Sequence, residues 1–369
     1  MTSVDVPVES IDVAVFTVPT DAPEADGTLA WSSTTLVVAS PVAGGRRGLG
    51  WSYTGAAAKT LIDDTLTEVV VGRCALDVPG TFEAMVRRVR NLGRPGLVST
   101  AISAVDIALW DLKAKLLDLP LCRLIGAVRA EVPVYGSGGF TSYDEQQTRD
   151  QLGHWVHDLG IPRVKIKIGE SWGSRERRDL DRIALAREII GPDTELFVDA
   201  NGGYSVGQAV RVADRFSAYD VRWFEEPVSS DDLAGLAAIR REVQPDVAAG
   251  EYGYDLVYFA RMVDSGAVDC LQVDVTRCGG VTEFLRAAAV AAARNLQLSA
   301  HCAPNLHAHP AACVPNLRHV EYFHDHVRIE EMLFRGALSP KSGALVPDAG
   351  RPGLGLELRE REAEPYRVA

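Results

Sequence analysis

The sequence predicts a compact (β/α) barrel that follows a smaller α+β unit. The first 130 residues and the part of the chain after them differ in pattern, because strand-like alternation and long helical periodicity give way to short apolar runs separated by loops and helical segments. Eight such runs occur, and strands that alternate with helices favour a barrel. A doubly wound open sheet normally carries a glycine-rich phosphate turn, and neither GxGxxG nor GxxxxGK followed by Ser or Thr comes after any run.

The N-terminal unit is predicted to contain a small sheet followed by helices. Apolar residues alternate over 11–15 as in a strand, and residues 35–38 are typical of its partner. The polar stretch 20–27 contains Pro and Gly and predicts a mobile surface loop between these strands. Over 99–118 apolar residues recur at steps of three and four, which predicts a helix that Pro120 ends.

The barrel strands are predicted at short apolar runs rich in β-branched and aromatic residues. These runs are 132–135, 164–168, 196–198, 221–224, 247–249, 270–273, 296–299 and 319–323. Helical segments fit between them; the segment 174–190, for example, is followed by Gly191 and Pro192, a common way for a helix to end.

Composition and charge exclude several classes of protein. The chain has 369 residues, 47% of them hydrophobic and 24% charged, with a net charge of −12. An acidic chain has no basic excess to neutralise phosphates, so we expect neither a nucleic-acid nor a membrane partner. We also expect no secretory signal and no membrane-spanning run. Six scattered cysteines without a CxxC pair are typical of reduced thiols, which predicts a cytoplasmic enzyme.

Acidic residues stand where three consecutive barrel strands are predicted to end. Asp199, Glu225 and Glu251 are each one strand–helix unit apart, and the active site of such a barrel is built at the carboxyl ends of its strands. Three converging carboxylates repel one another unless a cation lies among them. Because the set contains oxygen donors and neither Cys nor His, it predicts a Mg²⁺ site.

Candidate proton-transfer groups flank these acids in the sequence. Lys165 and Lys167 are two positions apart on one predicted strand, so both side chains point the same way. A like-charged neighbour and a nearby divalent cation lower the pKa of a lysine, which suits a base. His301 ends the seventh strand and Asp274 the sixth, so we expect the carboxylate to orient the imidazole.

These motifs together resemble the mandelate racemase branch of the enolase superfamily. The resemblance rests on Lys165-x-Lys167, Asp199-Ala-Asn201, Glu225-Glu-Pro227, Gly250-Glu251, Asp274 with Gly279-Gly280 after it, and His301. The segment 106–113 also resembles the capping domain of that family. The muconate-cycloisomerase branch places a lysine at the sixth strand end, where this sequence has Asp274.

The resemblance implies a fold and a set of roles. It implies a modified TIM barrel, (β/α)7β, over 131–326, with a capping domain built from 1–130 and the C-terminal segment 327–369. It implies the following site: Asp199, Glu225 and Glu251 as Mg²⁺ ligands, Lys167 and the His301–Asp274 dyad as acid/base groups on opposite faces of the substrate, Lys165 beside the substrate carboxylate, and Glu321 as hydrogen-bond donor to the developing enolate.

The expected substrate is a small-molecule carboxylate with an acidic α-hydrogen. We expect Asn201 and Tyr135 to contact it, and Trp51 and Tyr53 to close over it together with the loop near 20–33. The segment 135–143 is rich in hydroxyls, which favours dehydration of a sugar acid, either an aldonate or an aldarate. Racemisation or epimerisation of a 2-hydroxy acid and cycloisomerisation of a sugar-acid lactone remain alternatives, as do a Schiff-base aldolase and a non-catalytic descendant. The family suggests a homo-oligomer, a dimer or an octamer.

Overall fold

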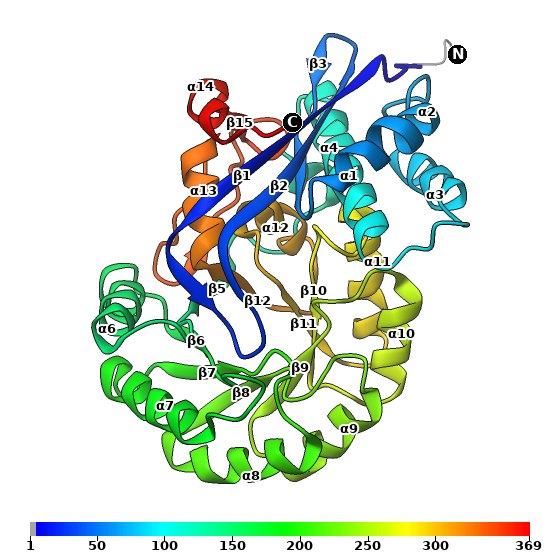
Figure 1. Cartoon of the computed structure of the whole chain (residues 1–369). Coiled ribbons are helices and arrows are strands. Elements are labelled where there is room, and N and C mark those ends of the chain that lie inside the picture. Colours follow the sequence, from blue (N-terminus) through cyan, green and yellow to red (C-terminus); the bar gives the residue numbers. More distant parts are fainter. Residues whose placement is uncertain (1–4) are drawn as a thin grey trace.

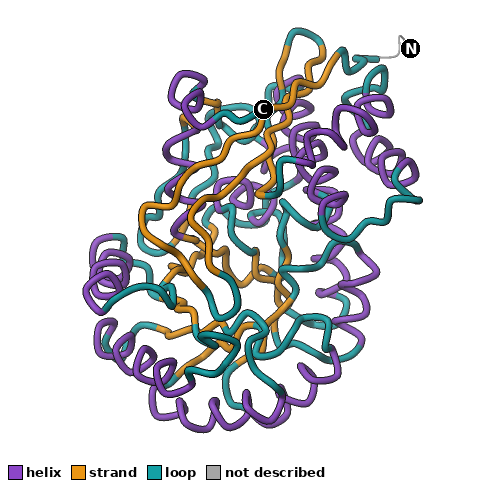
Figure 2. Tube along the Cα trace, in the orientation of Figure 1, coloured by secondary structure: helices purple, strands orange, loops and turns teal. Residues whose placement is uncertain are grey.

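The computed structural model describes residues 5–369 and has two parts (Figure 1). An antiparallel sheet and a group of helices form the N-terminal part, and a closed ring of parallel strands surrounded by helices forms the rest. Figure 2 shows these strands at the centre of the ring with the helices outside. The predicted barrel with an α+β capping domain is confirmed. Within residues 5–369, no helix has both the length and the apolar character that a membrane crossing requires.

The capping sheet is built around one long hairpin. β1 and β2 pair antiparallel in continuous register from Ser10↔Val42 to Pro19↔Ser33. Apolar side chains from both strands pack under the helices, and the helix predicted over 99–118 is α4. The elements of this part are β1 (Ser10–Ala25), β2 (Ala30–Ala43), β3 (Arg46–Arg47), β4 (Gly50–Tyr53), α1 (Ala57–Leu61), α2 (Thr67–Val70), α3 (Val78–Arg88), α4 (Leu97–Leu116) and α5 (Leu121–Ile125), with a π-helical turn at Ile62–Leu66.

The prediction of a mobile loop over 20–27 is wrong. The hairpin resumes its pairing after a bulge, with Glu24↔Trp31 and Ala25↔Ala30, so only the short segment 26–29 joins the strands. A bulge accommodates prolines that a regular strand pair would exclude, which is why composition alone suggested a loop here. The segment 26–29, which we call the hairpin turn, reaches across the carboxyl ends of the barrel strands (Figure 1).

The eight predicted runs form the eight strands of the barrel. Each pairs in parallel with the next, and β12 pairs with β5 to close the ring. The strands are β5 (Val132–Gly138), β6 (Arg163–Lys167), β7 (Glu195–Asp199), β8 (Val221–Glu225), β9 (Asp246–Ala249), β10 (Cys270–Val273), β11 (Gln297–Ala300) and β12 (Leu317–Phe323). The short strand β14 (Ala344–Leu345) adds antiparallel to β5.

The barrel helices lie between the strands along the chain and outside them in space (Figure 1). They are α6 (Glu145–Gly153), followed by a π-helical turn at His154–Asp158, α7 (Glu176–Ile190), α8 (Val206–Phe216), α9 (Leu233–Glu242), α10 (Leu256–Asp264), α11 (Gly280–Ala292) and α12 (Pro304–Ala311), and a 3-10 turn follows α8 at Ser217–Tyr219. The helix predicted over 174–190 is α7, which starts two residues later.

The C-terminal segment returns to the capping sheet. It contains α13 (His324–Leu333), β13 (Phe334–Arg335), β15 (Glu357–Leu358), α14 (Glu360–Ala363) and a 3-10 turn at Glu364–Tyr366. Two backbone hydrogen bonds join the last residues to β1: the amide of Val15 donates to Ala369, and that of Val368 donates to Val15. Because β14 in the same segment pairs with the barrel, the domain boundaries at 130 and 326 stay a prediction.

Candidate active site

Three carboxylates from neighbouring strands meet above the barrel. Register pairs Lys167 with Asp199 and Asp199 with Glu225, so these residues lie at one level at the strand ends. Glu251 follows β9, and one ligand oxygen from each of the three acids lies within 4.8 Å of the others. All three side chains are buried. The structure thus brings together the residues that the sequence predicted as a metal site.

The donor set suits a magnesium ion. Each of the three acids offers carboxylate oxygen, the ligand that Mg²⁺ prefers. The Oε2 atom of Glu251 is buried and faces His301 Nε2 at 3.2 Å, and buried carboxylate oxygens held this close together are costly unless a cation or a donor meets them. Burial and the nearby carboxylate of Asp199 raise the pKa of Glu225, which is the effect expected of anions held together.

Two lysines of β6 face the acids from one side. The ammonium of Lys167 donates to Asp199, and that of Lys165 donates to Glu225. Lys165 also lies 2.8 Å from Glu321. Burial favours a neutral amine, but the carboxylates of Asp199, Glu321 and Glu225 together outweigh burial and raise the pKa of Lys167. The predicted lowering of this pKa depends on a divalent cation that neutralises the charge of Asp199, and it stays a prediction.

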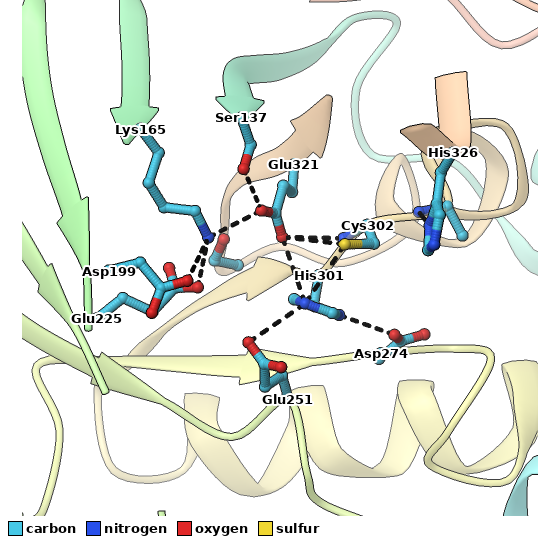
Figure 3. A network of polar contacts seen from close by, with 12 residues as sticks. Ser137, Lys165, Asp199, Glu225, Glu251, Asp274, His301, Cys302, Glu321 and His326 are labelled. Atoms are coloured by element: carbon cyan, nitrogen blue, oxygen red, sulfur yellow. Dashed lines mark hydrogen bonds and ion pairs between the residues drawn. The ribbon is translucent and has the colours of Figure 1, made fainter. Parts of the chain in front are cut away.

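An imidazole faces the acids from the other side. His301 Nδ1 lies 2.8 Å from Asp274 Oδ2, and its Nε2 lies 3.2 Å from Glu251 Oε2 (Figure 3). Thr276 fixes Asp274, since its backbone amide and its hydroxyl both donate to Oδ1 at 2.7 Å. Burial opposes the imidazolium, but the neighbouring Cys302 and Glu251 outweigh burial and raise the pKa of His301 well above its usual value. The carboxylate therefore orients the ring, as predicted for this pair.

The two proton-transfer candidates lie on opposite sides of the carboxylates. Lys167 contacts Asp199, the ligand candidate on β7, whereas His301 contacts Glu251, the ligand candidate after β9. Figure 3 shows the imidazole beside Glu251 with its other nitrogen toward Asp274. A molecule bound at the three acids therefore has an amine on one side and an imidazole on the other.

Glu321 is held as an ionised acceptor. It accepts hydrogen bonds from the Ser137 hydroxyl at 2.5 Å and from the Cys302 amide at 3.1 Å, and it pairs with Lys165. Burial raises its pKa, but the charges of Lys165 and His301 outweigh burial and lower the pKa of Glu321 well below its usual value. In this arrangement it is an acceptor, and the donor role toward an enolate that the resemblance implies stays a prediction.

Two of the four predicted substrate-contacting residues are buried away from open space at the site. Tyr135 is fully buried within the barrel, where its ring packs against Phe197 and its neighbours beneath the ammonium of Lys165. Trp51 is also fully buried and stacks on Phe334. Neither side chain is exposed to open space at the site. Trp51 is covered by packing between the cap and the C-terminal segment, and Tyr135 is covered by its neighbours inside the barrel.

The other two predicted residues, Tyr53 and Asn201, lie closer to the three clustered carboxylates. The ring of Tyr53 stacks on His326, whose Nδ1 accepts from the amide of Ala303 next to the active-site turn. Asn201 adopts a positive φ of 45°, and its backbone amide donates to Asp199 Oδ1 at 2.9 Å. Asn201 therefore lies directly beside the predicted metal site, whereas Tyr53 contacts it only through other residues.

Three residues that the sequence analysis did not single out complete the site. Arg277 pairs with Glu251 at 3.1 Å and with Asp274 at 3.5 Å, which links the three clustered carboxylates to the pair of His301 and Asp274. Its position three residues after Asp274 was the available signal. The thiol of Cys302 lies 3.3 Å from His301 Nε2. Glu226 is buried at a positive φ of 36° and keeps an unpartnered oxygen, and only its place beside Glu225 marked it.

Two family models match nearly the whole chain. The mandelate racemase/muconate lactonizing enzyme N-terminal domain matches residues 10–126, and the enolase C-terminal domain-like family matches residues 147–363. Among curated proteins, a 3,6-anhydro-alpha-L-galactonate cycloisomerase from Streptomyces coelicolor is 36% identical over 281 residues, which cover 75% of this chain and 77% of the relative. An L-talarate/galactarate dehydratase from Salmonella typhimurium is 30% identical over 327 residues, which cover 86% of this chain and 78% of the relative.

Solved structures agree with these matches. A mandelate racemase/muconate lactonizing enzyme-like protein from Rubrobacter xylanophilus is 47% identical, with a TM-score of 0.95 and coverage of 98% of this chain and 100% of that one. A racemase from Streptomyces coelicolor, crystallised with bound magnesium, is 31% identical, with a TM-score of 0.92 and the same coverage. The chain therefore belongs to the mandelate racemase/muconate lactonizing enzyme family of the enolase superfamily.

Proposed function

We propose that this protein removes the proton α to the carboxylate of a sugar acid and then eliminates the β-hydroxyl, which gives a 2-keto-3-deoxy acid. One observation carries the proposal: a trio of buried carboxylates lies between the amine of Lys167 and the imidazole of His301. Two groups able to move protons on opposite sides of one anchoring point suit a reaction that removes a proton and a hydroxyl from adjacent carbons.

Asp199, Glu225 and Glu251 would hold Mg²⁺, consistent with their oxygen donors and with the close approach of the three buried carboxylates. When bound, this ion supplies positive charge that stabilises the carboxylate as its α-carbon loses a proton. The buried ammonium of Lys165 adds a further positive charge beside the same acids, and we assign it to the substrate carboxylate.

The remaining steps belong to side chains. In its neutral form His301 has its Nδ1 proton directed to Asp274, which leaves Nε2 free to accept a proton. Lys167 performs the same role from the opposite side once it is deprotonated. Whichever group takes the α-proton, the protonated form of His301 can donate through Nε2 to the leaving hydroxyl, so that the hydroxyl departs as water. Asp274, fixed by Thr276, stabilises the imidazolium throughout.

Cycloisomerisation of a sugar-acid lactone or anhydro sugar acid is the second candidate. The cycloisomerase from Streptomyces coelicolor that is 36% identical to this chain favours it. The same first step serves both reactions, and they differ in the group that leaves. Racemisation or epimerisation of a 2-hydroxy acid needs only return of the proton from the other side, and it would use the same two residues.

Incubation with Mg²⁺ in D₂O tests the proposal. A panel of aldonates, aldarates and their lactones would be followed by NMR for deuterium at the α-carbon and for 2-keto products. Dehydration predicts a 2-keto-3-deoxy acid, cycloisomerisation predicts a rearranged product without loss of water, and epimerisation predicts exchange alone. The absence of exchange and of product across the panel would overturn the proposal.

The setting of the enzyme is also a proposal. All six cysteines are free thiols, which supports a reducing compartment such as the cytoplasm. The partner is a small-molecule carboxylate, and assembly into a dimer or octamer stays a prediction.

A further inference from the structure

The hairpin turn and the cap cover much of the barrel mouth. At the ends of β6 and β7, Gly27 lies so close that an added Cβ would be 2.6 Å from the carbonyl oxygen of Ile168 and 2.9 Å from that of Ala200. On another side, Ser52 of β4 hydrogen-bonds to the carbonyl of Thr276 after β10. These contacts hold the hairpin turn and the cap directly against the carboxyl ends of the barrel strands.

Aromatic packing covers the side of β5, β11 and β12. Phe140 contacts Trp31, Tyr143 and Phe323 edge to face, and Cys302 belongs to the same buried cluster. This cluster includes Cys302, the residue after His301, so buried aromatic side chains pack directly beside the histidine on this side.

A hollow of about 450 Å³ lies over the ends of β7, β8 and β9. Asn201 and Glu226 line its inner end, beside the metal acids, and each has a buried oxygen without a hydrogen-bond partner. Trp172 and Tyr252 line its outer part and are 70% and 41% exposed. The hollow therefore begins beside the predicted metal site and opens to solvent.

The charged side chains that line this hollow are all acidic. Its lining includes Glu226, Asp231 and Asp255 and, among the residues that the structure describes, no Lys, Arg or His. The Asp255 carboxylate caps α10 by accepting from the amide of Tyr258. The nearby Arg277 is already paired with Glu251 and Asp274. The lining therefore offers a second carboxylate only uncharged hydrogen-bond donors, such as Ser229 and Tyr254, and no positively charged side chain among the described residues.

We propose that this hollow takes the uncharged, hydroxyl-bearing end of the substrate, so that the substrate is a monocarboxylate sugar acid, open-chain or ring-containing, rather than a dicarboxylate. Hydroxyl groups can donate to the acidic side chains of the lining and accept from its hydroxyls, whereas a second carboxylate would meet negative charge with no positively charged side chain to offset it. The aromatic faces of Trp172 and Tyr252 suit the C–H surface of a polyol or sugar ring. This inference rests on the proposed function and selects one of its two substrate classes.

Matched pairs of acids test the inference. Gluconate and glucarate share the configuration of their chiral carbons and differ at C6, as do galactonate and galactarate. We expect dissociation constants from calorimetry on the Mg²⁺-loaded protein to be at least about tenfold lower for the monocarboxylate of the pair that binds, with kcat/KM favouring the same member wherever turnover occurs. Asp231 is exposed at the hollow, so Asp231→Arg should move the ratio of the two constants at least about fivefold toward the dicarboxylate.

Asp181 provides the matched control, because it is exposed on the outer face of α7 and does not line the hollow. Asp181→Arg changes net charge equally and should leave the ratio unchanged. Equal or tighter binding of the dicarboxylates, or equal effects of both variants, overturns the inference while turnover still supports the proposed function. If monocarboxylates bind preferentially but nothing reacts, the inference stands and the proposed reaction fails.

Discussion

Gly27 offers a direct test of whether the hairpin turn must close on the barrel. The turn is held by backbone hydrogen bonds: Trp172 donates to the carbonyl of Gly27 at 2.9 Å, and Thr141 donates to that of Ala25 at 2.8 Å. In Gly27→Ala the new Cβ would approach three carbonyl oxygens, those of Ile168, Ala200 and Gly169, at 2.6, 2.9 and 2.9 Å. All three belong to the barrel backbone and cannot rotate away, so the turn itself must lift.

The cost follows from these contacts. Overpacking of a fitted position costs about 1–3 kcal/mol, and each strained hydrogen bond is worth about 1 kcal/mol. A shift of about 2 kcal/mol in the equilibrium between seated and lifted turn lowers kcat/KM roughly 30-fold if only the seated form reacts. The barrel and the rest of the cap keep their packing, so Tm should fall by no more than about 4 °C.

Two measurements check this expectation. Hydrogen exchange at the amides of Trp172 and Thr141 should accelerate in Gly27→Ala, and kcat/KM on the best acid of the panel should fall. Gly55→Ala is the control, because Gly55 lies in the same cap, has no atom within 4 Å of an added Cβ and has ordinary φ. Unchanged exchange and a kcat/KM within twofold of wild type would show that closure of the turn does not govern the reaction.

Three further predictions concern the site and the cap. Lys167→Ala and His301→Asn should each lower kcat by about 10²- to 10⁴-fold with unchanged circular dichroism; near-normal rates in both would refute their assignment as proton-transfer groups. EDTA should abolish turnover and MgCl₂ restore it, and MgCl₂ at about 100 times its Kd should add about 2.7 kcal/mol to the free energy of unfolding, measured by denaturant titration. Glu225→Gln should lose most of this gain, and an equal gain in the variant would contradict a metal site there. Burial, reinforced by Asp325, raises the pKa of Glu24 to about 8, so its proton is held more tightly in the folded than in the unfolded chain. The stability that this proton contributes is present at low pH and is lost as pH rises from about 4.5 to 8. The Tm of the wild type should therefore fall relative to that of Glu24→Gln over this pH range. Parallel curves of Tm against pH for the two proteins would refute the prediction.

Much of the site was predictable from the sequence because it depends on local pattern and one topological rule. Alternating short apolar runs and helices specify a parallel barrel, and the rule that barrel active sites lie at strand carboxyl ends places Asp199, Glu225 and Glu251 together. Lys165 and Lys167 share a face because strand side chains repeat every two residues. These relations hold whatever the packing of the cap.

The sequence by itself therefore determined the barrel, the acid trio and the lysines and histidine that flank it, since each position follows from strand order and side-chain period. Only the tertiary structure decided which residues have open space beside that centre. Trp51 and Tyr135 are buried by packing partners far away in the chain, while Arg277 and Glu226 join the site through side-chain direction. The ordered hairpin over 20–27 likewise depends on docking against the barrel. Such contacts arise between segments whose meeting no local periodicity encodes.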